Sequence, residues 1–237
     1  MGRTVAREWT DLFGSVVVAA RRRGAAGFPI TFIATAAVIG LAVLNIGPAG
    51  HHVIRAWFDE YARLPMSTAV ARLVPSFAAP TAYLPAWGAI AQVAVVFGMA
   101  EALYGTRVTV LVALFCHSAA TLSARFFIWL GPHVAFGMIH IARVYADSGP
   151  SGATVGLMAF LAVRRRNVSG ALLLTAFIVG EWFDKHGMAQ REHIVAALLG
   201  AALALAAEWW ASARVATSAT PQAALVSVGT ASSSEER

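Results

Sequence analysis

A serine flanked by turn-forming residues stands directly ahead of an apolar stretch. The segment Asp147–Ala153 reads DSGPSGA, with Ser151 between Gly149 and Gly152. Glycines beside a serine keep neighbouring side chains away from its hydroxyl. If a helix begins at Ser151, its free N–H groups supply donors for an oxyanion next to that hydroxyl. This pattern predicts a nucleophilic serine; the alternative is helix packing, because Gly152 and Gly156 form a GxxxG pair.

A serine nucleophile needs a general base, and we predict that His193 is this base. Among the seven histidines, it stands at the start of the last apolar stretch, and Gly200 follows seven residues later. In a six-helix topology, the helices that begin at Ser151 and near His193 both run inward, so the two residues share one outer depth. Small residues such as Gly156, Ala196 and Gly200 would let the two helices approach closely. Taken alone, His193 also fits an interfacial histidine that caps a helix.

The composition predicts that membrane helices position these two residues. The chain has 237 residues, of which 58% are hydrophobic and 13% are charged, and this is about half the charge of a typical soluble domain. A disordered chain, a disulfide-stapled secreted module and an ordinary soluble enzyme are therefore excluded. The net charge of +6 indicates basic cytoplasmic loops rather than nucleic-acid binding. We expect an integral membrane protein whose partner is the lipid bilayer, with no nucleic acid.

Windows without charged residues predict six membrane-crossing helices, because an ionised side chain at the bilayer centre is costly. A lone span needs about 20 apolar residues, so the shorter windows fit helices inside a bundle. Residues 126–142 contain Pro132 and two histidines and are predicted to form an embedded loop. A seventh span there would put Arg164–Arg166 outside while Arg21–Arg23 stays inside. The six predicted helices cover residues 28–48, 84–104, 107–128, 151–164, 168–184 and 192–211.

These helices divide the chain into three regions. Residues 1–27 form a cytoplasmic N-terminal segment, residues 28–212 the transmembrane domain, and residues 213–237 a disordered cytoplasmic tail rich in Ser, Thr and Ala. Residues 51–72 mix aromatic and charged side chains at roughly helical spacing, which predicts an interfacial helix. Both arginine triplets fall on the inner side in this arrangement, so both termini are predicted to be cytoplasmic.

Three stretches resemble the rhomboid family of intramembrane serine proteases, over about residues 74–208. The first is GPSGATVGL at Gly149–Leu157, which is similar to the GxSG motif of the family and the helix that follows it. The others resemble the end of the second helix, and the fifth loop with the sixth helix, of bacterial rhomboids. They are EALYGTR, with Glu101, Gly105 and Arg107, and the segment that contains Trp182, His193 and Gly200.

The resemblance implies an all-α polytopic fold, a rhomboid-like bundle of six transmembrane helices in a bacterial plasma membrane. It implies an intramembrane serine protease that cleaves transmembrane segments of other membrane proteins, with no cofactor and no metal. Ser151 would be the nucleophile and His193 the general base of a dyad without an acid. The oxyanion would be held partly by the backbone N–H of Ser151, in the loop formed with Gly149 and Gly152.

The remaining motif residues are predicted to be structural. Glu101 and Arg107 flank a tight cytoplasmic turn at Gly105, and we expect an ion pair between them. Trp182 belongs to the motif of the fifth loop. His117, inside the third helix, is predicted to be a hydrogen bonder that faces the bundle.

The chain departs from the family pattern at several positions. The second-helix His and Asn that help to hold the oxyanion fall near Pro85 and Ala89, which offer no side-chain donor. Losing such a donor typically raises the barrier by about 3–4 kcal/mol. The aromatic residue often found four after the serine is Val155, and the first Gly of HxxGxxxG is Ala196. Three other residues are considered as substitute donors: Gln92, His133 and His140.

These departures favour an alternative function, a catalytically inactive rhomboid-like protein that binds membrane clients. A third hypothesis is a transporter or another non-catalytic bundle, motivated by the histidines within apolar segments. The chain lacks the inverted repeat expected of many transporters, which argues against this third hypothesis.

Overall fold

The computed structural model describes residues 5–80, 85–184 and 187–232, and this part of the chain is all-α. It contains nine α-helices, two short 3-10 helices and one pair of two-residue strands. In chain order the elements are α1 (Val5–Arg23), a 3-10 turn (Ala25–Gly27), α2 (Pro29–Leu44), α3 (Pro48–Trp57), β1 (Glu60–Tyr61), α4 (Met66–Ser76), α5 (Ala86–Tyr104), α6 (Thr106–Leu130), a second 3-10 turn (His140–Val144), β2 (Ala146–Asp147), α7 (Ser151–Arg164), α8 (Val168–Asp184) and α9 (Met188–Ser232).

Three of the described helices are long and apolar enough to cross a membrane: α5, α6 and the Met188–Arg214 part of α9. The helices α2, α7 and α8 are apolar but shorter. The six stretches predicted to be helical are thus all helices, and three of them meet the length of a membrane crossing. These three long apolar helices indicate an integral membrane protein.

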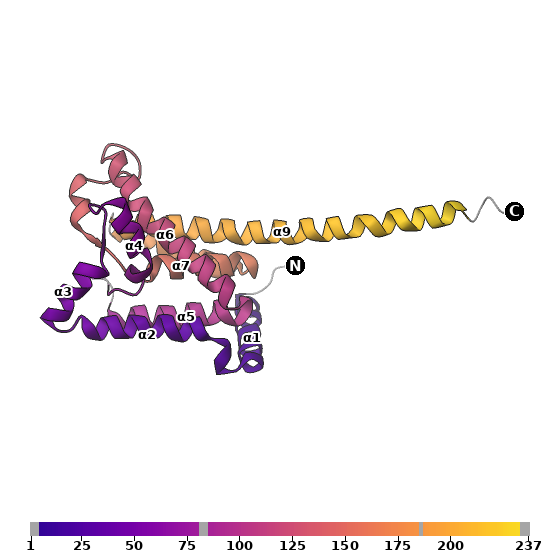
Figure 1. Cartoon of the computed structure of the whole chain (residues 1–237), viewed down its shortest axis with the longest axis horizontal. Coiled ribbons are helices and arrows are strands. Elements are labelled where there is room, and N and C mark those ends of the chain that lie inside the picture. The colour runs from indigo at the N-terminus through magenta and orange to yellow at the C-terminus, as the bar shows by residue number, and fades with distance from the viewer. Residues whose placement is uncertain (1–4, 81–84, 185–186, 233–237) are drawn as a thin grey trace.

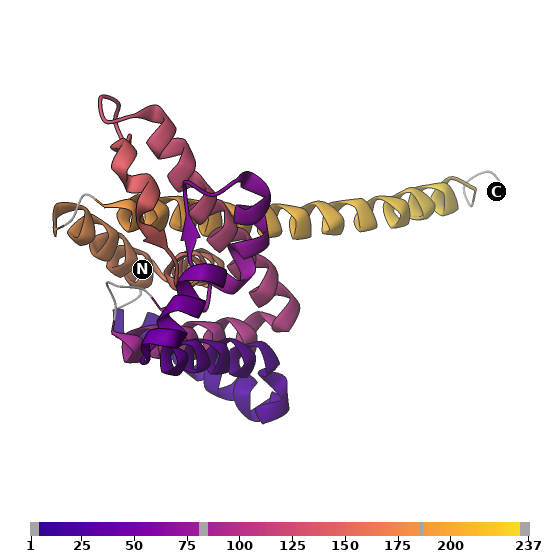
Figure 2. The same ribbon diagram turned by 60° about the vertical axis from the view of Figure 1, so that its left-hand side comes forward.

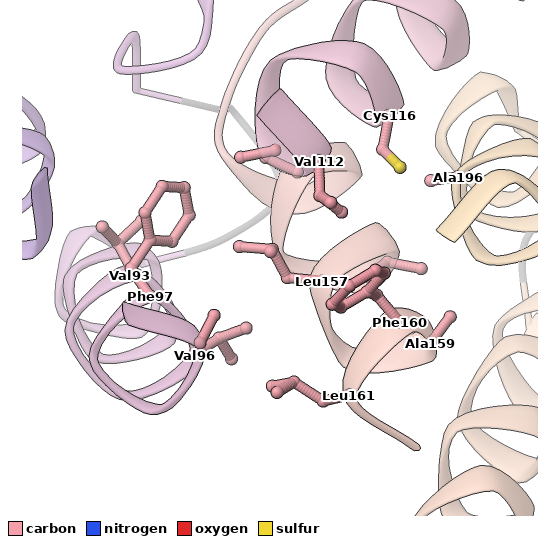
Figure 3. Packing of buried hydrophobic residues seen from close by; sticks show 14 of the residues in the cluster. Val93, Val96, Phe97, Val112, Cys116, Leu157, Ala159, Phe160, Leu161 and Ala196 are labelled. Atoms are coloured by element: carbon pink, nitrogen blue, oxygen red, sulfur yellow. The ribbon is translucent and has the colours of Figure 1, made fainter. Parts of the chain in front are cut away.

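The central helix of the fold is α7. It packs against α5, α6, α8 and α9, while α2 lies along α5 (Figure 1). Its residues Gly152–Leu157 and Ala159–Ala162 are buried, as expected for a helix that is apolar all round. Figure 3 shows Leu157 and Leu161 of α7 directed toward Val96 of α5. The C-terminal part of α9 projects beyond the other helices in the views of Figures 1 and 2.

The helices α7 and α9 touch backbone to backbone, at the glycines where close packing was predicted. A Cβ added to Gly200 would lie 2.0 Å from the carbonyl oxygen of Gly156. A Cβ added to Gly156 would lie 2.4 Å from the Cβ of Cys116 on α6. Because Gly156 and Gly200 have no side chain, the helices α6, α7 and α9 can approach one another closely at these positions.

The segment between α6 and α7 is a loop, as predicted for residues 126–142, although α6 itself continues to Leu130. Residues 131–150 contain only a 3-10 turn and strand β2, so a seventh span in this segment is excluded. Strand β2 pairs antiparallel with β1, with Glu60 opposite Asp147.

The prediction of a single interfacial helix over residues 51–72 is wrong. Two helices, α3 and α4, are separated by β1, and Pro65 directly precedes α4, because proline cannot continue a preceding helix.

Helix α1 was not predicted, because the search for spans relied on uncharged windows and α1 carries both acids and arginines. It is attached to the bundle by Glu8, whose carboxylate accepts hydrogen bonds from the N–H and hydroxyl of Ser169, at 2.8 and 2.7 Å, in the first turn of α8. At the other end of the chain, α9 is helical to Ser232 and covers most of the tail predicted to be disordered over residues 213–237, while residues 233–237 lie outside the described part of the chain. Alanine is frequent there and favours helix.

Candidate functional site

The first turns of α7 and α9 lie side by side, because the two helices run parallel and in register. Three connections, from the segment before α7 to the last residue of α7, establish this arrangement. They are the side-chain contact of Asp147 with Glu192, the backbone contact of Gly156 with Gly200, and the approach of Arg164 to Glu208 at 3.9 Å.

This register brings Ser151 and His193 to nearly the same level. His193 lies about two residues before the level of Ser151, roughly 3 Å along the axis at a rise of about 1.5 Å per residue. Ser151 is the first residue of α7 and is half-buried, whereas His193 is buried in the second turn of α9. His193, Ala196 and Gly200 are spaced by three and four residues, so they share the face of α9 that meets α7.

The two ring nitrogens of His193 have different surroundings. Nδ1 lies 2.6 Å from Oε2 of Glu181 on α8. Nε2 is buried and has no hydrogen-bond partner within the described part of the chain, Ser151 included. Since a carboxylate only accepts hydrogen bonds, Nδ1 carries the proton in the neutral ring and Nε2 is the basic nitrogen. Such an Nε2 is suited to take a proton from a hydroxyl, and catalytic hydrogen bonds are often long before substrate binds.

The carboxylate of Glu181 was missed, and the prediction of a dyad without an acid did not include this contact. The available signal was a glutamate at the edge of the apolar stretch 167–180, next to Trp182. An acid so close to an apolar run needs a partner, but the sequence does not say which.

The turn that leads to Ser151 depends on Gly149. Its φ of +118° is disfavoured for other residues, and its N–H donates to the carbonyl oxygen of Ser76 at 2.9 Å. Gly152 has a packing role: an added Cβ would lie 3.4 Å from the Cβ of Ala120 and 3.6 Å from the Cα of His117. Gly149 thus shapes the loop at Ser151, while Gly152 lets α7 approach α6.

One of the three substitute donors lies near Ser151. Thr154 Oγ1 is 3.0 Å from the carbonyl oxygen of Ser151 and 3.1 Å from Oε1 of Gln92 on α5. The amide of Gln92 is therefore within about one helical turn of the serine. His133 and His140 are exposed on the loop after α6, and no hydrogen bond joins either of them to Ser151 in the described part of the structure.

A second serine–histidine pair is buried between α4 and α6. Ser76 Oγ lies 3.2 Å from Nε2 of His117, and the same nitrogen lies 2.9 Å from the carbonyl oxygen of Leu73. Because a carbonyl oxygen only accepts, Nε2 of His117 is protonated and cannot take a proton from Ser76. The pair fastens α4 to α6, as predicted for a hydrogen-bonding His117.

Acidic side chains just before α7 and near the start of α9 form a carboxyl cluster that was also missed. The side chain of Asp147 contacts that of Glu192 and faces Glu60, and Glu60 pairs with Arg125 at 2.6 Å. Burial and, to a lesser extent, the charge of Glu60 raise the pKa of Asp147 from 3.8 to about 6. Two carboxyls in contact favour sharing one proton. In the sequence, Asp147 and Glu192 closely precede Ser151 and His193, and this proximity was the available signal for the cluster.

Asp147→Asn is expected to remove a pH-dependent loss of stability. The pKa of Asp147 in the folded chain is raised, so its contribution to stability is fully present below about pH 4 and is lost as the pH rises through about 6. The unfolding temperature of the wild type in detergent should therefore fall by a few degrees between pH 4 and pH 8 relative to Asp147→Asn. Asp11→Asn, on the exposed side of α1, is the control and should parallel the wild type. Parallel curves for Asp147→Asn and wild type would contradict the prediction.

Glu101, Gly105 and Arg107 lie around the turn between α5 and α6, but the predicted ion pair between Glu101 and Arg107 is wrong. The carboxylate of Glu101 is fully buried and accepts the N–H and hydroxyl of Thr31, at 2.8 and 2.7 Å, and the hydroxyl of Thr106 at 2.6 Å. Arg107 is exposed, and the described residues include no ion pair between it and Glu101. Because Thr31 lies in the first turn of α2, Glu101 binds the N–H groups of a helix start, which favours a negative charge. Gly105, at a φ of +82°, joins α5 to α6.

Trp182 holds the loop after α6 against α8. Its ring centroid lies 5.2 Å from that of Phe136, and the guanidinium of Arg191 lies 5.2 Å from the Trp182 ring. Arg191 also donates to the carbonyl oxygens of Phe136 and Gly137, at 2.7 and 3.1 Å. Trp182 is thus part of a structural cluster that joins α8, α9 and this loop.

Comparison with known proteins does not add a family assignment. No protein-family model matches the chain, and no curated protein matches it. The resemblance to rhomboids therefore rests on the quoted motifs.

Proposed function

We propose that the chain is an intramembrane serine protease of rhomboid type, with Ser151 as the nucleophile and His193 as the general base. One observation carries this proposal. The parallel register of α7 and α9 brings Ser151 within about two residues of the level of His193, whose buried Nε2 has no hydrogen-bond partner among the described residues. A base with one nitrogen held by a carboxylate and the other left open is the arrangement that activates a serine.

The proposed reaction follows from these positions. Nε2 of His193 takes the proton as Ser151 Oγ attacks the scissile carbonyl, and later gives this proton to the leaving amine. The backbone N–H of Ser151, at the positive end of α7, stabilises the oxyanion. The amide of Gln92 is the second donor in this proposal, since it lies one turn away. Water then hydrolyses the acyl-enzyme, with His193 again as the base.

The proposed membrane domain comprises α2 and α5–α9, with the site toward the outer side and both termini in the cytoplasm of a bacterium. The 14 residues of α7 span about 21 Å, less than the roughly 30 Å hydrocarbon core. This helix is nevertheless acceptable in a membrane because the surrounding helices shield it from lipid. Contacts of α1 support one inner face for both arginine triplets: Arg23 donates to the Glu101 carbonyl oxygen at 3.1 Å, and Arg165 to Ser15 at 2.6 Å.

A second candidate function is a client-binding protein without catalysis. It is favoured by Pro85 and Ala89, which stand where the family carries oxyanion donors, and by the lack of a hydrogen bond between Ser151 and His193. In this case the site would bind transmembrane segments of other proteins and leave them intact.

The test is labelling of the purified protein by a fluorophosphonate probe. We expect the wild type to react, and Ser151→Ala and His193→Ala to lose the reaction by about 10³-fold or more, because the nucleophile or its base is gone. Ser76→Ala should still be labelled, since His117 cannot activate Ser76. In liposomes, the wild type should also cleave a transmembrane substrate whose helix is destabilised.

The outcomes separate the two candidates. Equal labelling of wild type and Ser151→Ala would contradict the assignment of the nucleophile. A wild type that binds the transmembrane substrate but neither labels nor cleaves would support the client-binding function.

A further inference from the structure

One face of α8 holds the His193 ring by two contacts. Glu181 Oε2 lies 2.6 Å from Nδ1, and the ring centroid of Phe177 lies 6.1 Å from that of the imidazole. Phe177 and Glu181 are four residues apart and therefore neighbours on the same helical face. The Glu181 side chain is 25% exposed and that of His193 is 6% exposed, so the pair is largely shielded from water.

Two charged residues that precede His193 in the chain, Arg191 and Glu192, have other partners. Glu192 precedes His193 in the chain, but its side chain contacts Asp147. Arg191 is directed to carbonyl oxygens of the loop after α6. Within the described residues, His193 is the only hydrogen-bond or ion-pair partner of Glu181.

We propose that Glu181 is a positioning residue that completes a Ser151–His193–Glu181 triad. This inference rests on the proposed protease function. Glu181 accepts the Nδ1–H of His193 and so holds the ring in the tautomer whose Nε2 is basic. When Nε2 takes the serine proton, the carboxylate stabilises the imidazolium that forms.

The position of Glu181 on α8 has a structural consequence for the site. Ser151 is on α7 and His193 on α9, so the carboxylate adds a third helix to the constellation. Packing of α8 against α7 and α9 then sets the orientation of the base, and a shift of α8 would move Nε2 relative to the serine. Catalytic groups need such support, because small misplacements are costly.

The experiment compares Glu181→Gln, Glu181→Asp and the wild type in the full-length chain. Gln preserves the shape and removes the charge, so we expect the labelling rate and the kcat for a transmembrane substrate to fall roughly 10²-fold, with little change in KM. Asp restores the charge on a shorter side chain and should recover part of the rate. Glu208→Gln, on α9 about four helical turns after His193 and with its side chain 33% exposed, is the matched control and should retain the wild-type rate.

A spectroscopic readout separates positioning from a general effect on folding. The proton between Nδ1 and Glu181 should give a downfield ¹H resonance in the wild type that disappears in Glu181→Gln and in His193→Ala. It should persist in Ser151→Ala, which keeps the Glu181–His193 contact.

The results distinguish a failure of the role proposed for Glu181 from a failure of the proposed protease function. A labelled wild type with equal rates for Glu181→Gln, or with Glu181→Asp as slow as Glu181→Gln, overturns the role of Glu181 and leaves the protease function standing. A wild type that neither labels nor cleaves overturns the proposed function and the triad with it.

Discussion

Gly200→Ala is expected to destabilise the folded chain by about 3 kcal/mol or more, the upper end of the cost of overpacking. The added Cβ would lie 2.0 Å from the carbonyl oxygen of Gly156, 2.8 Å from its carbonyl carbon and 3.0 Å from its Cα. All three are backbone atoms of the central helix α7, so no side-chain rotation relieves the clash. The helices must separate, and this moves His193 away from Ser151. Unfolding in detergent by denaturant or heat measures the loss, and probe labelling should fall in parallel.

Gly180→Ala is the matched control. Gly180 lies in α8, and a Cβ added there meets no atom within 4 Å. In the absence of a clash, Gly to Ala in a helix stabilises by about 0.5–1 kcal/mol. Equal stability of Gly200→Ala and Gly180→Ala would mean that α7 and α9 are farther apart than described.

Glu101→Ala is expected to cost about 3 kcal/mol or more, because each buried donor left without a partner costs roughly 1–3 kcal/mol. The fully buried carboxylate accepts from the N–H groups of Ile30 and Thr31 and from the hydroxyls of Thr31 and Thr106. Alanine leaves these donors unpaired at the first turns of α2 and α6 and removes a negative charge from the positive end of α2. The measurement is equilibrium unfolding in detergent, with limited proteolysis near residue 28 to detect release of α2.

Glu208→Ala is the control for this prediction. Glu208 also lies on an apolar helix, but its contact with Arg164 is 3.9 Å long and both side chains are partly exposed. Pairs of this kind contribute about 0–1 kcal/mol. If Glu101→Ala were no more destabilising than Glu208→Ala, the role of Glu101 at the start of α2 would be refuted.

At the turn around Gly105, the contacts of Glu101 and Arg107 were harder to predict than the turn itself. The turn at Gly105 was predicted from the sequence, and the ion pair from the opposite charges on its two sides. In the structure, Glu101 instead reaches the start of α2, about 70 residues earlier in the chain. The N–H groups of a helix start compete successfully for a carboxylate, and an exposed arginine can be solvated by water instead.

The class of protein and the positions of the apolar helices could be predicted from the sequence alone. Long uncharged stretches have few alternatives to helix in a membrane, because backbone groups must be bonded within the segment. Small residues at 152, 156 and 200 indicated where helices could touch, and the GxSG motif indicated Ser151. These signals are local, so they can be read along the chain.

The contacts between side chains of different helices could not be predicted in this way, because they depend on how the helices pack. Glu181 and His193 belong to different helices, and their contact depends on how α8 rotates against α9. The contact of Asp147 with Glu192 and that of Glu8 with Ser169 likewise join distant segments. A helical pattern states which residues share a face, but the direction of that face is set by the packing of all its neighbours. For this reason Ser151 and His193 could be predicted from the sequence, while the contact of the Glu181 carboxylate with His193 could be found only in the folded structure.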